Sequence, residues 1–258
     1  MIHYHGLPVS GPQSENTEFA KNRHVLVSFA HPEPLPLVHD VCSSFCLDNG
    51  AFTFWGAEQK ALKKGIEAKP VQWDKFVEWV GVWDKHPSYD FCFVPDVIGG
   101  TQEQNEELLQ KYYGKLKNPV PIYHLHESLE WAAQLAKYSP RIAIGSSGEW
   151  PTPGTNKWWV RMSEVMEAVC DSNGCPQTKI HGLRMLNPKV FTRLPLSSAD
   201  SCNAAINAGS VSRFKAYLPP KSSMRAAVIA ANIEMSNSAS YWKREIVTED
   251  DITEDNVN

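Results

Sequence analysis

The chain has 258 residues, of which 42% are hydrophobic and 21% charged, and its formal net charge is −4. These fractions are those of a globular protein, and they exclude a disordered chain, a collagen and a coiled coil. The longest apolar runs, such as 226–231, are far shorter than the roughly 20 residues of a membrane-spanning helix. No secretory signal is visible and the six cysteines are irregularly spaced, so we expect reduced thiols and a cytoplasmic protein.

Short apolar runs typical of buried strands alternate with helical stretches along the chain. The expected strands are 1–5, 24–30, 43–48, 90–96, 120–126, 141–147, 179–186 and a run within 193–200. The expected helices are 57–67, 71–85, 101–116, 127–138, 157–170, a stretch from 201 onward and 222–239. This alternation predicts an α/β protein with a parallel sheet, and eight units would close into a (β/α)8 TIM-like barrel.

The alternative to a barrel is an open, doubly wound parallel sheet. No glycine-rich dinucleotide or phosphate-binding loop follows any predicted strand, and this disfavours the open sheet. We expect one barrel domain over residues 1–247. The remaining segment, 248–258, carries five acidic residues and no basic one, and is expected to be a disordered tail.

Polar side chains stand at the ends of several predicted strands, where the catalytic residues of a barrel lie. Three of them are carboxylates from different strands, Asp48, Asp96 and Asp200. Each alone could be structural, Asp48 as a turn residue before Asn-Gly and Asp200 as a helix N-cap. Their joint placement favours chemistry. The same ends also carry His124, His126, Gly145, Ser146, His181 and Arg184.

The stretch 172–233 contains eight basic residues around a single acid, Asp200. Such a balance predicts a surface that receives phosphates, although a basic but inert face is the alternative. The residues proposed to contact a nucleic-acid backbone are Arg184, Lys189, Arg193, Arg213 and Lys215.

These residues fit three functions. In glycosyl transfer, one carboxylate attacks the anomeric carbon while another carboxyl group handles the leaving group's proton. In a metal-dependent barrel hydrolase, histidines and a late aspartate would bind one or two catalytic metal ions. In a catalytically inactive barrel, the same surface would only bind nucleic acid. The candidate ligands of the metal hydrolase are His3, His5, His124, His126, His181 and Asp200.

Five segments resemble, in order, those of the tRNA-guanine transglycosylase superfamily. CLDNGAFTFW at 46–55 resembles its Asp-Ser-Gly-Gly-Phe segment, FVPDVIGG at 93–100 its second base-binding strand, and IAIGSSGEW at 142–150 its base-contacting loop. LPLSSADSCNA at 194–204 and HYHGLPVSG at 3–11 are similar to the bacterial and phage branch that modifies DNA, the DpdA-like 7-deazaguanine transglycosylases. The resemblance covers about residues 2–205.

The resemblance implies a (β/α)8 barrel that replaces guanine in a nucleic acid with a free 7-deazaguanine base of the preQ0 type. Asp200 matches the nucleophile that attacks C1′, and Asp48 the residue that shuttles the base's proton. Asp96 matches the carboxylate that binds the base's exocyclic amine and ring N–H.

The remaining base contacts are less specific. Gly145 and Ser146 match the loop whose backbone N–H groups bind the base carbonyl, and His124 or His126 lies where the family has a polar base contact. Phe52 could stack on the base, although a core phenylalanine is the alternative.

The chain also departs from the tRNA-modifying enzymes. These carry a Cys-x-Cys-x-x-Cys…His zinc site after the nucleophile, whereas here only Cys202 follows Asp200. We therefore expect no structural zinc and no other cofactor. An appended RNA-binding domain is also missing, which favours DNA over RNA as the partner, in a bacterial or phage-infected cytoplasm.

Overall fold

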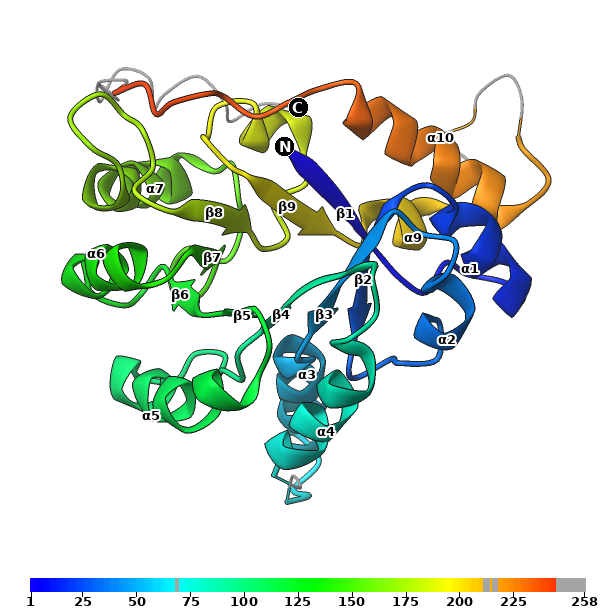
Figure 1. Cartoon of the computed structure of the whole chain (residues 1–258), viewed down its shortest axis with the longest axis horizontal. Coiled ribbons are helices and arrows are strands. Elements are labelled where there is room, and N and C mark those ends of the chain that lie inside the picture. The colour runs from blue at the N-terminus through cyan, green and yellow to red at the C-terminus, as the bar shows by residue number, and fades with distance from the viewer. Residues whose placement is uncertain (68–69, 211–213, 215–217, 245–258) are drawn as a thin grey trace.

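The computed structural model describes residues 1–67, 70–210, 214 and 218–244. These residues form one parallel β-barrel wrapped by helices (Figure 1). The single-domain, α/β TIM-like barrel predicted from the sequence is thereby confirmed. Two of the predicted phosphate contacts, Arg213 and Lys215, and the acidic tail 248–258 lie outside the described residues.

The barrel closes through a strand that is broken in two. In the described residues the strand order is β5-β4-β3-β2-β1-β9-β8-β7-β6, with parallel pairing throughout. Pro121 separates β5 from β6, so these two pieces occupy one of eight positions in the ring. The strands are β1 (Ile2–Gly6), β2 (His24–Ser28), β3 (Ser44–Asp48), β4 (Tyr89–Phe93), β5 (Pro119–Val120), β6 (Ile122–His124), β7 (Arg141–Gly145), β8 (Lys179–Gly182) and β9 (Ser198–Ser201).

Helices connect successive strands on the outside of the ring (Figure 1). Side-chain caps fix the starts of four of them: Thr101 for α5, Ser128 for α6, Thr155 for α7 and Asn187 for α8. The helices are α1 (Gln13–Ala20), α2 (Leu35–Val38), α3 (Ala51–Leu62), α4 (Trp73–Trp83), α5 (Gln102–Tyr112) with the 3-10 turn η1 (Tyr113–Lys115), α6 (Leu129–Tyr138), α7 (Asn156–Val169), α8 (Pro188–Phe191), α9 (Asn203–Asn207) and α10 (Ser222–Glu234).

The main differences from the expected elements lie at their boundaries. The helix expected at 57–67 begins at Ala51, because Gly50 adopts a left-handed conformation, φ 80°, and the helix follows directly. The last strand, expected within 193–200, occupies Ser198–Ser201, after Pro195, which has no N–H to donate to a ladder. Helix α1 was not expected, because QSENTEFA has few apolar residues to show a helical period.

Two layers of core hold the barrel together. Inside the ring, a buried cluster that includes Tyr4, Phe91 and Phe93 fills the interior. Outside it, the larger cluster joins the strands to the helices, with Trp158 of α7 completely buried. Each such side chain contributes about 1.5–3 kcal/mol through burial. The filled interior leaves the carboxyl ends of the strands as the place for a cavity.

Candidate active site

A cavity of about 460 Å³ opens at the carboxyl ends of the strands. It is lined by Asp48 at the end of β3, Asp96 just after β4 and Asp200 in β9. The structure therefore brings together three carboxylates that are far apart in sequence. Asp96 and Asp200 are 5% and 4% exposed, while Asp48 is partly exposed. Negative charges in one cavity raise the pKa values of the neighbouring carboxyl groups, so the protonation state and the hydrogen-bond partners of each carboxylate need separate description.

Asp200 is held through one of its two oxygens. Its Oδ1 accepts hydrogen bonds from His181 Nε2–H and from the backbone N–H of Arg184, both at 3.1 Å. No described residue donates to its Oδ2. His181 is completely buried, and its Nδ1 lies 2.8 Å from Ser198 Oγ. When the His181 ring is neutral, its Nε2–H donates to the Asp200 carboxylate and its Nδ1 accepts from the Ser198 hydroxyl.

The alternative role of Asp200 as a helix cap is not what the structure shows. Asp200 lies within β9, and the N-cap position of α9 is Cys202, without a side-chain cap bond. Cys202 also lines the cavity, but burial, together with the charges of Asp200 and Asp48, raises its thiol pKa to about 11. Cys202 is therefore protonated at neutral pH and unsuited to act as a nucleophile.

Asp48 is both a turn residue and a carboxyl group with a raised pKa. Its Oδ2 accepts the Gly50 N–H at 3.0 Å, as a turn residue before Asn-Gly would. Burial, and then the charges of Asp200 and Asp96, raise its pKa to about 6 against the opposing hydrogen bonds from Ser28 and Gly50. A carboxyl group with this pKa exchanges protons near neutral pH, as general acid–base catalysis requires.

Asp96 is the centre of a buried polar network. Its Oδ1 accepts from Asn49 Nδ2 at 2.7 Å, and its Oδ2 lies 2.9 Å from His124 Nε2. Burial lowers the pKa of His124, but the hydrogen bond and charge of Asp96 outweigh it and leave this pKa raised. The buried His124 Nδ1 has no partner among the described residues. Asn49 also donates to the Val94 carbonyl, so β3 and β4 position Asp96 together.

Glu127, a buried carboxylate that the sequence did not single out, binds the backbone of His124. Glu127 is 3% exposed, and its Oε2 accepts the backbone N–H of His124 at 2.8 Å. Its Oε1 accepts from Asn105 Nδ2, also at 2.8 Å, and burial raises the pKa of Glu127. Nothing in the sequence distinguished Glu127 from an ordinary residue of the helix expected at 127–138. Asn49 was likewise missed, although it follows Asp48 directly.

The mouth of the cavity carries an aromatic–cationic pair. Phe52, near the start of α3, is 48% exposed, and the Arg184 guanidinium carbon lies 4.1 Å from its ring centroid. Phe52 is therefore not a core residue. Arg184 takes a left-handed backbone conformation, φ 58°, just after β8, which also directs its N–H to Asp200. Trp55 lies one turn further along α3, with its ring centroid 5.7 Å from that of Phe52.

Of the residues predicted to contact the base, Gly145 and Ser146 lie at the cavity and His126 does not. Gly145 and Ser146 line it, and no described residue accepts a hydrogen bond from the Ser146 N–H. The Ser146 hydroxyl accepts from Trp158 Nε1 at 2.9 Å. His126 is not among the cavity-lining residues: its ring nitrogens are engaged by Ser147 Oγ at 2.8 Å and the Gly100 carbonyl at 2.7 Å. His126 thus joins two loops rather than facing a ligand.

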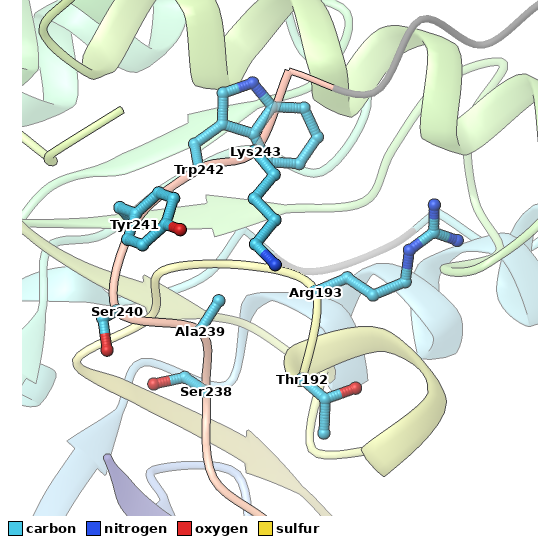
Figure 2. A pocket seen from close by; sticks show the side chains of 8 residues that line it. All are labelled: Thr192, Arg193, Ser238, Ala239, Ser240, Tyr241, Trp242 and Lys243. Atoms are coloured by element: carbon cyan, nitrogen blue, oxygen red, sulfur yellow. The ribbon is translucent and has the colours of Figure 1, made fainter. Parts of the chain in front are cut away.

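The predicted basic surface does not gather around the cavity. Arg184 lies at the mouth, whereas Lys189 is exposed on α8 and does not line it. Arg193 belongs to a separate pocket of about 440 Å³, with Thr192 and residues 238–243 (Figure 2). This pocket lies at the opposite end of the barrel, because residues 192–197 lead into the start of β9. The Arg193 guanidinium stacks on Trp159, 4.3 Å from the ring centroid.

The histidines of the metal-hydrolase alternative are not brought together. His3 and His5 flank the inward-facing Tyr4 on β1 and point out of the barrel. His3 Nε2 lies 3.1 Å from the Ser236 carbonyl, and His5 Nε2 lies 2.9 Å from Glu234 Oε1. Within the described part of the chain, no group of three metal-ligand side chains suited to an ion occurs in the cavity.

No helix among the described residues is long and apolar enough to cross a membrane. In the comparisons with known proteins, no family model matches the chain, and no curated protein or solved structure gives a significant match.

Proposed function

We propose that the protein is a base-exchange transglycosylase, replacing guanine in DNA with a 7-deazaguanine base of the preQ0 type. The observation that carries the proposal is the pairing of Asp200 and Asp48 in one cavity. Asp200 has one oxygen held by two N–H donors and the other without a described donor, while Asp48 has a pKa of about 6. A nucleophile and a proton carrier are what glycosyl exchange requires.

The exchange proceeds in two steps that share one covalent intermediate. Asp200 Oδ2 attacks C1′ of the nucleotide, the C1′–N9 bond to guanine breaks, and protonated Asp48 gives its proton to the departing base. The 7-deazaguanine then enters, and ionised Asp48 takes the proton from its ring N9–H. That nitrogen attacks C1′, the bond to Asp200 breaks, and Asp200 and Asp48 return to their starting states. The polynucleotide chain is never cleaved.

The remaining cavity residues bind the base. We assign to the cavity-lining Asp96 carboxylate the role of accepting from an exocyclic amine and ring N–H, and to the Ser146 N–H that of donating to a base carbonyl. His124, bonded to Asp96, adds a ring nitrogen without a described partner. Phe52 and Arg184 offer two flat faces at the mouth, suited to stacking on a base. The target must be unpaired or flipped out, because C1′ of a stacked nucleotide is out of reach.

The test is release of labelled guanine from DNA and from tRNA, in parallel, with preQ0 added. We expect release from DNA, loss of release in Asp200→Asn, and a protein–DNA adduct by intact mass that the variant cannot form. Glu58→Gln, an exposed acid on α3, is the matched control and should behave as the unmodified protein. Release from tRNA alone would overturn the substrate. Salt-dependent DNA binding that Asp200→Asn leaves unchanged, with no release, would indicate a barrel that only binds nucleic acid.

A further inference from the structure

A group of three metal-ligand side chains lies at the opposite end of the barrel from the cavity. His39 and Asp40 lie between α2 and β3, and His86 lies between α4 and β4. His39 Nε2 is 3.4 Å from Asp40 Oδ2, and His86 Nε2 is 3.3 Å from Asp40 Oδ1. One ligand atom from each residue lies within 4.8 Å of the other two. Two segments separated by more than 40 residues thus present three ligands to one point.

The two imidazole rings are fixed in place. The His39 ring packs edge-on against Trp83, with centroids 5.1 Å apart, and the His86 ring lies 5.7 Å from that of Phe45. Both histidine side chains are 22% exposed, whereas the Asp40 side chain is 76% exposed. The histidines are therefore held by the core, while the side of the cluster formed by Asp40 is open to solvent and to an incoming ion.

The Asp40 carboxylate lies between the Nε2 atoms of His39 and His86. His39 Nδ1 lies 3.2 Å from the Leu35 carbonyl, to which only an N–H can donate. In the neutral ring, the lone pair of His39 Nε2 therefore faces the Asp40 carboxylate, and two acceptors oppose each other. No Lys or Arg in the described part of the chain forms an ion pair with Asp40. A cation between these atoms would remove the conflict.

We propose that His39, Asp40 and His86 bind one divalent transition-metal ion of the zinc class. Imidazole nitrogens with one carboxylate suit zinc, copper and nickel, and do not suit magnesium or calcium, which prefer oxygen ligands. The Leu35 carbonyl acts as the second-shell acceptor that orients a metal-bound imidazole. Water fills the remaining coordination positions on the open side.

His86 limits the affinity of this site. Its Nδ1 accepts the Ser88 N–H at 3.1 Å, so its Nε2 carries the proton that lies toward Asp40. Binding a metal through Nε2 requires that this proton leave or move to Nδ1, which breaks the Ser88 bond. We therefore expect a micromolar rather than a nanomolar site, with affinity falling as the pH is lowered.

The position of the cluster indicates a structural role for the ion. It would link the turn that precedes β3 to the turn that precedes β4, and these two strands are neighbours in the barrel. The amino-terminal end of such barrels contributes to stability rather than to chemistry. Bound metal should accordingly raise the unfolding temperature and leave the carboxylate cavity unchanged.

The test is calorimetric titration of the full chain with zinc chloride, together with thermal unfolding. We expect about one ion per chain, and a rise in Tm of about 5–10 °C at 100 times the Kd. His39→Gln and His86→Gln should each weaken binding at least about tenfold, and Asp40→Asn should weaken it as well. His31→Gln, an exposed histidine at the other end of the barrel, is the matched control.

Cobalt(II) distinguishes this site from binding at the free thiols of Cys175 and Cys202. We expect visible absorption bands without a thiolate charge-transfer band, abolished by His86→Gln. Zinc binding that all three cluster variants leave unchanged, a thiolate band, or no binding at millimolar zinc would each overturn the proposal. None of these readouts depends on base exchange, so they are independent of the proposed function.

Discussion

Replacing Asp48 with asparagine should stabilise the protein while it abolishes exchange. The pKa of Asp48 rises from 3.8 to about 6 on folding, mainly through burial and then through the charges of Asp200 and Asp96. Such a shift corresponds to about 3 kcal/mol of destabilisation at pH 8. Asparagine has the same size, and its Oδ1 can still accept the Gly50 N–H. We expect Asp48→Asn to recover about 2 kcal/mol, since the amide remains desolvated.

The pH dependence of this gain gives the sharper test. The folded state binds more protons at Asp48 than the unfolded state between about pH 4 and 6, so stability falls as pH rises through this window. The gain from Asp48→Asn should therefore be complete above about pH 7 and nearly absent at pH 4.5, where the destabilisation by Asp48 has fallen to about 1 kcal/mol and the desolvated amide offsets it. A gain of about 2 kcal/mol raises Tm by about 4–8 °C in a chain of this size.

The assay is thermal unfolding of the unmodified protein, Asp48→Asn and Glu58→Gln at pH 4.5 and pH 8. The same preparations should be assayed for guanine release, which we expect Asp48→Asn to lower by about 10²–10⁴-fold, because an amide moves no proton. A Tm below that of the unmodified protein at pH 8 would show that Asp48 is chiefly a turn residue. A gain undiminished at pH 4.5 would refute the assignment of its cause to the raised pKa.

Three further predictions follow from the same cavity. His181→Leu removes one of the two donors to Asp200 Oδ1 and should slow guanine release about 10–150-fold, with partial rescue in His181→Gln. Equal activity of the unmodified protein and both variants would exclude a positioning role for His181. Phe52→Ala should raise the KM for DNA about 5–150-fold, whereas Leu62→Ala, exposed on the same helix, should not; equal KM values would exclude stacking. In single-turnover assays guanine release should fall above pH 6 and base insertion should rise, and parallel pH profiles of the two steps would contradict the proton shuttle by Asp48.

The sequence predicted the order of the elements because a parallel barrel buries every strand on both faces. Runs such as 24–28 and 141–145 are consequently apolar almost throughout, and the charged residue that ends β3, Asp48, stands out. Where a connection is polar or very short, that signal is absent. This is why α1 was missed, and why the broken strand at Pro121 was expected to be continuous.

The cavity was predictable only in part, for a related reason. Position at a strand end gave Asp48, Asp96 and Asp200, since parallel strands all point their carboxyl ends to one side. Residues that bind Asp96 or His124 from distant parts of the chain have no such signal in the sequence. Asn49 and Glu127 look like ordinary turn and helix residues, and only the structure shows their hydrogen bonds to the Asp96–His124 pair. Composition also misled, because it placed Arg193 with Arg184 although they lie at opposite ends of the barrel.

The three carboxylates differ by their partners, and these differences favour exchange over metal-dependent hydrolysis. Asp96 is paired with the imidazole of His124, and Asp200 has N–H donors on one oxygen. Asp48 forms no ion pair with a basic side chain in the described part of the chain, and burial raises its pKa. The Nε2 atoms of His124 and His181 already face Asp96 and Asp200, so a metal ion bound through these two atoms would have to break both pairs. It would also lower the pKa of Asp48, removing the group that can carry a proton near neutral pH. The arrangement is thus matched to a reaction in which one carboxylate forms a bond and a second moves a proton.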